Sequence, residues 1–190
     1  SSAASDVYKR QPLGRKVAEE DICEADVVIY VISRISGEGK DRRKVKGDYY
    51  LSEREEEDLR YLAEMNKPVI LILNAGGPVE LTDILEQTDN IKGILNISQL
   101  GQEGGDALAD VLLGKEVPGG KLTTTWARRY EDYPASEEYG YLNGNLEKEK
   151  YKEGIYVGYR YFDSFDKKVM FPFGFGLSYT CLLYTSPSPR

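Results

Sequence analysis

The sequence predicts an α/β fold: a three-layer sandwich with a mostly parallel sheet and helices on both faces, followed by a long irregular Tyr-rich segment. Two observations carry this prediction. Short apolar runs with the length of buried strands alternate with stretches that have the apolar spacing of helices, which is the rhythm of βαβ units. After Ala127 this rhythm stops, and the chain becomes charged, rich in tyrosine and without a clear period.

The first elements are expected in the order helix, strand, helix. Residues 17–25 are expected to end a helix. Residues 27–33 are apolar nearly throughout, as in a strand that is covered on both faces. A second helix begins at Ser52, because Ser52 and Glu55 have the spacing of a capping box and apolar residues follow at helical spacing.

The remaining elements continue the alternation as far as Trp126. They are a strand at 68–73, a turn at 74–78, a helix at 79–85, a strand at 91–97, a helix at 102–114 and a fourth strand at 121–126. Residues 128–154 are then predicted to form a long surface excursion. Residues 154–165 are predicted to return to an extended form.

The two ends of the chain are expected to lie outside the domain. Residues 6–11 can be encoded by a DNA string that is, apart from a one-base offset, the reverse complement of one that encodes residues 181–186. Residues 1–11 and 181–190 therefore resemble translated sequencing adapters and are set aside. The predicted domain is 12–180, incomplete at its N-terminus, and the cellular compartment stays open.

Composition narrows the classes of function. The formal net charge is −7, which disfavours nucleic acid and anionic membranes as partners. No apolar run approaches the length of a membrane helix. The chain has no histidine, which excludes a Ser-His-Asp triad within these residues and disfavours a zinc enzyme. Carboxylates remain as the natural acid and base groups.

The segment after the first strand contains the candidate site residue. Residues 33–42 read SRISGEGKDR, which places the carboxylate of Glu38 between Gly37 and Gly39. Open α/β sheets bind ligands at the carboxyl ends of their strands. The residues alone favour a solvated Gly-rich turn over a catalytic loop, and both readings stay open at this point.

Four tyrosines near the C-terminal end of the domain also allow two readings. They are Tyr151, Tyr156, Tyr159 and Tyr161. Side chains of this kind line sugar sites, but tyrosines at alternating spacing more often pack a strand against a sheet. Packing is the favoured interpretation.

Six motifs together resemble one family. In order they are SRISGEGKDR, GDYYLS, KPVILILNAGGPVEL, GQEGGDALADVLLGKEVPGGKLTTTW, YKEGIYVGYRYFDS and FPFGFGLSYT. This series is similar to the second, α/β-sandwich domain of glycoside hydrolase family 3, the β-glucosidase family. The resemblance covers nearly all of residues 12–180, and the ordered series is far more specific than any one motif.

The resemblance implies a fragment of a retaining exo-β-glycosidase that acts on terminal β-D-glucosyl residues, with a β-glucoside or oligosaccharide as substrate. By this resemblance, Glu38 matches the general acid/base. The nucleophilic aspartate belongs to a (β/α)8 barrel domain of the same protein and is absent from these residues. No cofactor or metal is implied. The cations Arg34, Lys40, Arg42 and Arg43 would lower the pKa of Glu38, so they are expected to point away, with Asp41 available to pair with one of them.

Two other classes compete with a glycosidase. One is a non-catalytic carbohydrate-binding or interaction module that uses the sandwich only as a scaffold. The other is a Rossmann-like nucleotide binder, which the missing glycine fingerprint disfavours.

Overall fold

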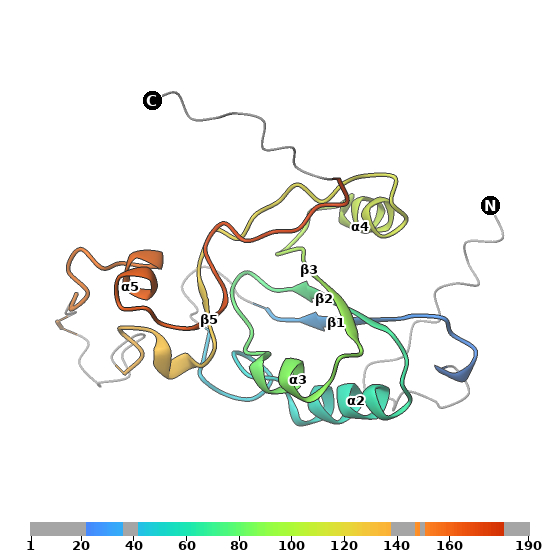
Figure 1. The fold of residues 1–190 in the computed structure, drawn as a ribbon, viewed down its shortest axis with the longest axis horizontal. Helices are drawn as coiled ribbons and strands as arrows, with labels where there is room; N and C mark the ends of the chain where they lie inside the picture. Colours follow the sequence, from blue (N-terminus) through green and yellow to red (C-terminus); the bar gives the residue numbers. More distant parts are fainter. Residues whose placement is uncertain (1–21, 36–41, 138–146, 149–150, 181–190) are drawn as a thin grey trace.

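The main layer of the computed structural model is a parallel three-stranded sheet (Figure 1). The structure describes residues 22–35, 42–137, 147–148 and 151–180. The strands are β1 (Val28–Ser33), β2 (Val69–Asn74) and β3 (Ile91–Asn96), in the order β1-β2-β3. Their parallel pairing brings the carboxyl ends of β1 and β2 together at one edge, where Ser33 lies opposite Asn74. The predicted α/β class and parallel sheet are confirmed.

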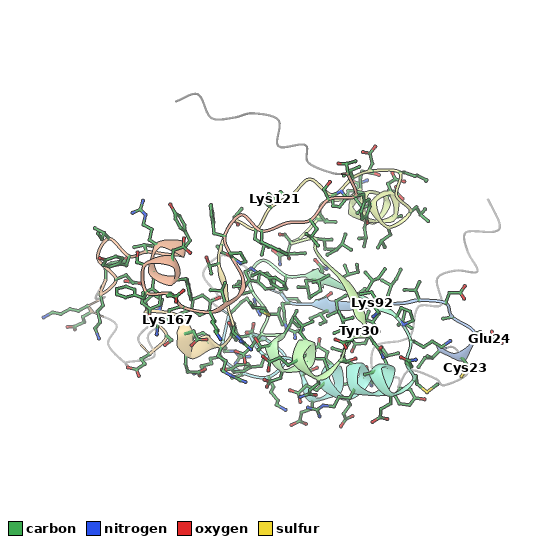
Figure 2. All side chains as sticks on the ribbon, in the orientation of Figure 1. Cys23, Glu24, Tyr30, Lys92, Lys121 and Lys167 are labelled. Atoms are coloured by element: carbon green, nitrogen blue, oxygen red, sulfur yellow. The ribbon has the colours of Figure 1, made fainter. Side chains whose placement is uncertain are left out.

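One face of this sheet is covered by α2 (Glu53–Glu64) and α3 (Thr82–Gln87), as Figure 1 shows. The predicted capping box begins α2: Glu55 N donates to Ser52 Oγ, and Ser52 N donates to the Glu55 carboxylate. The core lies between the sheet and these helices, and its fully buried members include Ile32, Leu59, Leu62, Leu71, Leu73, Val79 and Leu81. Tyr30, labelled in Figure 2, points from β1 to this same face and donates to Asp58 of α2.

The other face of β1 is exposed, which corrects the prediction that both faces of this strand are covered. Successive side chains of a strand alternate between faces. Ile29 and Val31 are accordingly 44% and 52% exposed, whereas Ile32 is fully buried. The helix α4 (Gly104–Leu112) lies on the opposite side of the sheet from α2 and α3 (Figure 1), but the described core cluster contains none of its side chains.

The predicted fourth strand at 121–126 does not extend the parallel sheet. Only Trp126–Ala127 is a strand, β4, and it pairs antiparallel with β5 (Val169–Phe171) in a second, two-stranded sheet. Backbone hydrogen bonds between Leu122 and residues 174–175 continue this pairing. The ring centroids of Trp126 and Phe171 are 6.0 Å apart. Trp126 is 3% exposed and belongs to the main core cluster, so the small sheet packs against the main core.

The prediction of an extended segment at 154–165 is also wrong, because a turn at 152–155, closed by a hydrogen bond from Tyr156 N to Glu153 O, leads into a helix. Residues 159–164 form the helix α5 (Tyr159–Ser164). It begins after Gly158, whose φ of +62° is a conformation that favours glycine. The short 3-10 helix η1 (Tyr130–Asp132) is the other regular element in this Tyr-rich part of the described chain.

Several predictions fall on residues that the structure does not describe. They are the segments 1–11 and 181–190, the residue Glu38 and part of the predicted excursion at 128–154. Of the predicted helix end at 17–25, the described residues Ile22 and Cys23 are helical, and Ile22 is 2% exposed. Within the described residues, no helix combines the length and apolarity that a membrane crossing requires.

Candidate functional site

The candidate site lies where β1 and β2 end. Glu38, the predicted catalytic residue, belongs to the segment 36–41 and lies outside the described residues. The described chain stops at Ile35 before this segment and resumes at Arg42 after it, and Arg34 lies directly after β1. Arg34 N donates to Asn74 O at 3.0 Å, which ties the exit of β1 to the end of β2.

Arg34 is buried, and each of its five guanidinium N–H donors has a partner. Its side chain is 4% exposed. Two hydrogen bonds of 2.7 and 2.8 Å join it to the Glu55 carboxylate in a bidentate pair. The other three run to the backbone oxygens of Ser33, Asp48 and Tyr50. These five hydrogen bonds use all five donors of the planar guanidinium group. A lysine, with three donors on one nitrogen, could not replace it.

Glu55 stays ionised in this environment. Burial alone raises the pKa of its carboxyl, but the hydrogen bonds from Arg34 and Ser52 favour the charged form and bring the net pKa below its usual value. Glu55 therefore both caps α2 and neutralises the cation at the exit of β1.

Arg42 is held by a second carboxylate. Its Nε donates to Asp48 Oδ1 at 2.9 Å, and its Nη1 donates to Pro78 O at 2.6 Å. The remaining carboxylate oxygen of Asp48 accepts from Arg43 N at 2.8 Å. Burial raises the pKa of Asp48, but these hydrogen bonds outweigh burial and the net pKa is lowered. The Arg42 link therefore connects the chain after residue 41 to the turn that follows β2.

These contacts bear on the expectation that the cations near Glu38 point away from it. The guanidinium groups of Arg34 and Arg42 are both paired with carboxylates, of Glu55 and Asp48. Their charges are therefore largely compensated within the described residues. Lys40 and Asp41 lie outside those residues, so their orientation stays a prediction.

A cavity of about 730 Å³ opens beside Arg42, a volume within the usual range for small-molecule sites. Gly76, Gly77 and Pro78, in the turn after β2, form its wall at the sheet edge. Aromatic rings make up much of the remaining lining: Tyr49, Tyr130, Tyr133, Tyr159, Phe162 and Phe173. A lining of aromatic rings with a few polar groups suits small ligands that have both apolar surface and hydroxyl groups.

The tyrosines of this wall support one another. The ring of Tyr49 meets that of Tyr130 edge to face at 5.0 Å. Tyr133 Oη accepts from Ala127 N at 3.1 Å. Burial raises the pKa of both Tyr49 and Tyr133, so these phenols remain neutral. The hydroxyl of Thr125, also in the lining, is buried and has no hydrogen-bond partner among the described residues.

Of the four tyrosines singled out in the sequence, only Tyr159 lines this cavity. Its ring stacks on Phe173 at 4.9 Å. Tyr151 is 86% exposed, and Tyr156 and Tyr161 contact Phe165. Packing against other aromatic rings is thus the main role of Tyr156 and Tyr161, but on a turn and a helix rather than on a strand against the sheet.

Sequence reasoning missed Asp48 and Tyr49 as members of the site. Both belong to the motif GDYYLS, which carried the family resemblance but assigned no role to either residue. The described residues contain no cluster of three or more acidic or cysteine side chains that would hold a metal ion.

The geometry defines the chain as an α/β domain whose candidate ligand site lies at the carboxyl edge of a parallel sheet. Residues 9–159 match the family model described as glycosyl hydrolase family 3 C-terminal domain. The chain belongs to this family.

Relatives with known functions are much longer than this chain. It is 38% identical to β-glucosidase A of Butyrivibrio fibrisolvens over 95% of the chain and 24% of that protein. The structure of β-glucosidase 3B from Thermotoga neapolitana in complex with glucose matches with a TM-score of 0.79 and 44% identity, over 92% of this chain and 25% of that one. A β-glucosidase structure from Paenibacillus barengoltzii matches with a TM-score of 0.79 and 35% identity, covering 88% and 18%. The chain thus spans about a quarter or less of these relatives.

Proposed function

We propose that this chain supplies one half of the active site of a retaining exo-β-glycosidase that releases terminal β-D-glucosyl residues. Glu38 is the general acid/base in this proposal. The nucleophile is an aspartate on a (β/α)8 barrel domain that these residues do not contain. A retaining mechanism requires two carboxyl groups about 5–5.5 Å apart. The general acid must be protonated and the nucleophile must be ionised.

The observation that carries the proposal is the pairing of the two arginines around residues 36–41. A general acid at neutral pH needs a raised pKa, and uncompensated cations lower it. The Arg34 and Arg42 guanidinium groups are bound by the Glu55 and Asp48 carboxylates. Two of the four cations in the stretch SRISGEGKDRR are therefore compensated by carboxylates of the described chain, which supports a proton donor in this stretch.

In the first step, the bond between the anomeric carbon and the glycosidic oxygen breaks as the aspartate of the barrel domain bonds to that carbon, and Glu38 protonates the oxygen so that the aglycone leaves as an alcohol. In the second step, Glu38 accepts a proton from water, whose oxygen attacks the anomeric carbon and displaces the aspartate, so that the sugar is released. The aromatic cavity beside Arg42 offers stacking surfaces next to the segment that carries Glu38. The identity of the relatives supports glucose as the sugar.

The test uses a chimeric enzyme in which residues 12–180 replace the matching part of the Thermotoga neapolitana β-glucosidase, hereafter the chimera. Alkyl β-glucosides have poor leaving groups, because the departing alcohol needs a proton. Glu38→Ala is therefore expected to reduce their turnover by about 10²–10⁴-fold. Dinitrophenyl β-glucoside needs little protonation, so its first step is expected to survive. Azide needs no general base, and it is expected to restore turnover and give a β-glucosyl azide.

The competing reading is a non-catalytic carbohydrate-binding or interaction module. It predicts that Glu38→Ala either leaves the turnover of every glucoside unchanged or lowers all turnover rates by the same factor, and that azide does not raise them. Either result would remove Glu38 as the acid/base.

A further inference from the structure

The cavity beside Arg42 is built from separate parts of the chain. Tyr49 comes from the loop before α2, Tyr133 follows η1, and Phe162 belongs to α5. Phe173 follows β5. The centroids of the Tyr133 and Phe162 rings are 5.8 Å apart, in an edge-to-face contact. The lining is therefore a set of rings held by tertiary packing, and every ring named here lies within the described residues.

Tyr159 and Phe173 form an accessible, nearly parallel pair in this lining. Their ring centroids are 4.9 Å apart, and the angle between the ring planes is 24°. The two residues are 42% and 50% exposed, whereas Phe162, in the same lining, is 3% exposed. Large exposed aromatic side chains beside a cavity indicate a surface against which a ligand packs. The pair therefore offers an aromatic face to another flat ring.

The buried polar groups of the lining are mostly paired within the protein. Arg42 Nε donates to the Asp48 carboxylate. The Tyr133 hydroxyl accepts from Ala127 N at 3.1 Å and donates to Thr125 O at 3.4 Å. The Thr125 hydroxyl, in contrast, is buried without a hydrogen-bond partner among the described residues. The lining thus offers many rings but few polar groups that a ligand could pair.

This composition favours an aryl group over a second sugar. A pyranose has hydroxyl groups around its whole ring, and each one that leaves water without a partner costs free energy. Apart from Tyr159, the exposed polar side chains among the described lining residues are Arg43, Thr123 and Thr124, too few to pair an enclosed pyranose. A flat ring with one hydroxyl loses little on transfer and gains the stacking face of Tyr159 and Phe173.

We infer that this cavity binds an uncharged aryl group, so that the substrates are aryl β-glucosides whose aglycone packs on the Tyr159 and Phe173 rings. This inference rests on the proposed function, which it narrows from β-glucosides in general to one class of aglycone. Arg42 connects the two, because it lines the cavity and follows Glu38 by four positions in the sequence. Four residues span at most about 14 Å, so the chain itself keeps the cavity wall near a substrate at Glu38.

The alternative is that the stacked pair only packs α5 against the residues after β5. Replacing Tyr159 would then lower stability, but the cavity would not bind an aryl probe and the choice of substrate would not depend on Tyr159.

The first experiment measures binding by the 190-residue chain without reference to activity. The probe is 2-naphthol, which is uncharged at pH 7. Its binding is followed at the amide signals of Gly77 and Thr124 in the cavity lining, with Gly93 of β3 as the reference elsewhere. We expect saturable shifts at Gly77 and Thr124 with 2-naphthol, and none at Gly93 or with cellobiose at the same concentration. No shift with 2-naphthol, or equal shifts with cellobiose, overturns the inference.

Tyr159→Ala removes one ring of the stacked pair, and Tyr156→Ala is its matched control. Tyr156 is 38% exposed, contacts Phe165 and is not among the lining residues. Tyr159→Ala is expected to weaken 2-naphthol binding by about 3- to 10-fold, and Tyr156→Ala is expected to leave it unchanged. Equal affinities in the two variants overturn the inference. If Tyr159→Ala does not fold, Phe173→Ala replaces it with the same expectation.

The second experiment measures substrate choice in the chimera. Tyr159→Ala is expected to lower kcat/KM for 2-naphthyl β-glucoside about 3- to 10-fold more than kcat/KM for methyl β-glucoside, chiefly through KM. Each glucoside has the same leaving group in both enzymes, so the change in this ratio reports aglycone binding and not proton transfer. Equal losses for the two glucosides overturn the inference.

Glu38→Ala separates the inference from the proposed function. In the 190-residue chain this variant is expected to bind 2-naphthol as the native chain does, because Glu38 acts on the glycosidic oxygen and not on the aryl ring. If Glu38→Ala shows the leaving-group effect in the chimera and Tyr159→Ala shows no selective loss, the inference fails and the proposed function stands. If 2-naphthol binds as expected and Glu38→Ala shows no leaving-group effect, the proposed function fails and the cavity remains an aryl-binding site.

Discussion

Arg34 and Arg42 donate hydrogen bonds to the same backbone oxygen, that of Asp48. The two arginines are eight positions apart in the sequence, with the segment of Glu38 between them. Each is also paired with its own carboxylate, Glu55 or Asp48. The convergence holds both sides of the segment without leaving either guanidinium charge uncompensated.

The pair of Arg34 and Glu55 is expected to contribute strongly to stability. Glu55→Ala leaves the Arg34 guanidinium, whose side chain is 4% exposed, without its counter-charge. Removing one partner of a buried ion pair typically costs about 3–5 kcal/mol. Chemical denaturation at pH 7 is expected to show a loss in this range in the free energy of unfolding.

Glu56→Ala is the matched control for that measurement. Glu56 is the next residue of α2 and pairs with Lys46 and Arg60 at 3.3 and 3.7 Å, all in more exposed positions. Exposed ion pairs contribute about 0–1 kcal/mol. Similar losses in Glu55→Ala and Glu56→Ala would show that the Arg34 site does not have the stabilising role assigned to it.

The sequence predicted the regular part of the fold well because local signals determine it. The capping box of Ser52 and Glu55 begins α2 as expected, and the apolar runs of β2 and β3 are strands. The fourth strand was assigned to the wrong sheet because periodicity identifies a strand but not its partner. The partner of Trp126 is Phe171, 45 positions later.

The site was less predictable because its contacts are distant in the sequence. Glu55 lies 21 positions from Arg34, and Pro78 lies 36 positions from Arg42. A single sequence contains no signal for either pairing. The alternation of residues 155–161 also resembled a strand, although the positive φ of Gly158 precedes a helix.

Leu71 and Ile29 are expected to differ in their contribution to the core. Leu71 of β2 is fully buried, whereas Ile29 of β1 is 44% exposed. Leu71→Ala is expected to cost about 2–5 kcal/mol through lost burial and the cavity that remains. Ile29→Ala is expected to cost less than about 1 kcal/mol, mainly through lower strand propensity. Equal losses in thermal or urea denaturation would mean that the outer face of β1 is covered in solution.

The chain alone is expected to have no glycosidase activity, because the proposed nucleophile belongs to another domain. The measurement is release of nitrophenol from an aryl β-glucoside by the purified chain, with chain carrying Glu38→Ala as the control for contaminating enzyme. Turnover that disappears in Glu38→Ala would show that these residues hold a complete active site.

Glu80 is expected to lower stability at neutral pH. Burial is the main cause that raises the pKa of its carboxyl above the usual 4.5, and the hydrogen bond from Tyr130 N only partly offsets it. The unfolded chain therefore releases this proton at a lower pH than the folded chain does. As the pH rises through this interval, the folded state binds more protons than the unfolded state, and stability falls. The destabilising contribution is complete above the folded pKa and absent below the unfolded pKa.

Glu80→Gln tests this sign. The amide oxygen of glutamine keeps an acceptor for Tyr130 N, and Arg129 keeps its 2.8 Å hydrogen bond to Asp83. The variant is expected to be more stable than the native chain at pH 7, with a gain that shrinks towards zero as the pH falls below about 4.5. Glu57→Gln, at an exposed position of α2, is the control and is expected to show no such change. A Glu80→Gln variant that is less stable at pH 7 would show that the carboxylate is held by favourable charge interactions with Arg129 that outweigh the cost of its burial.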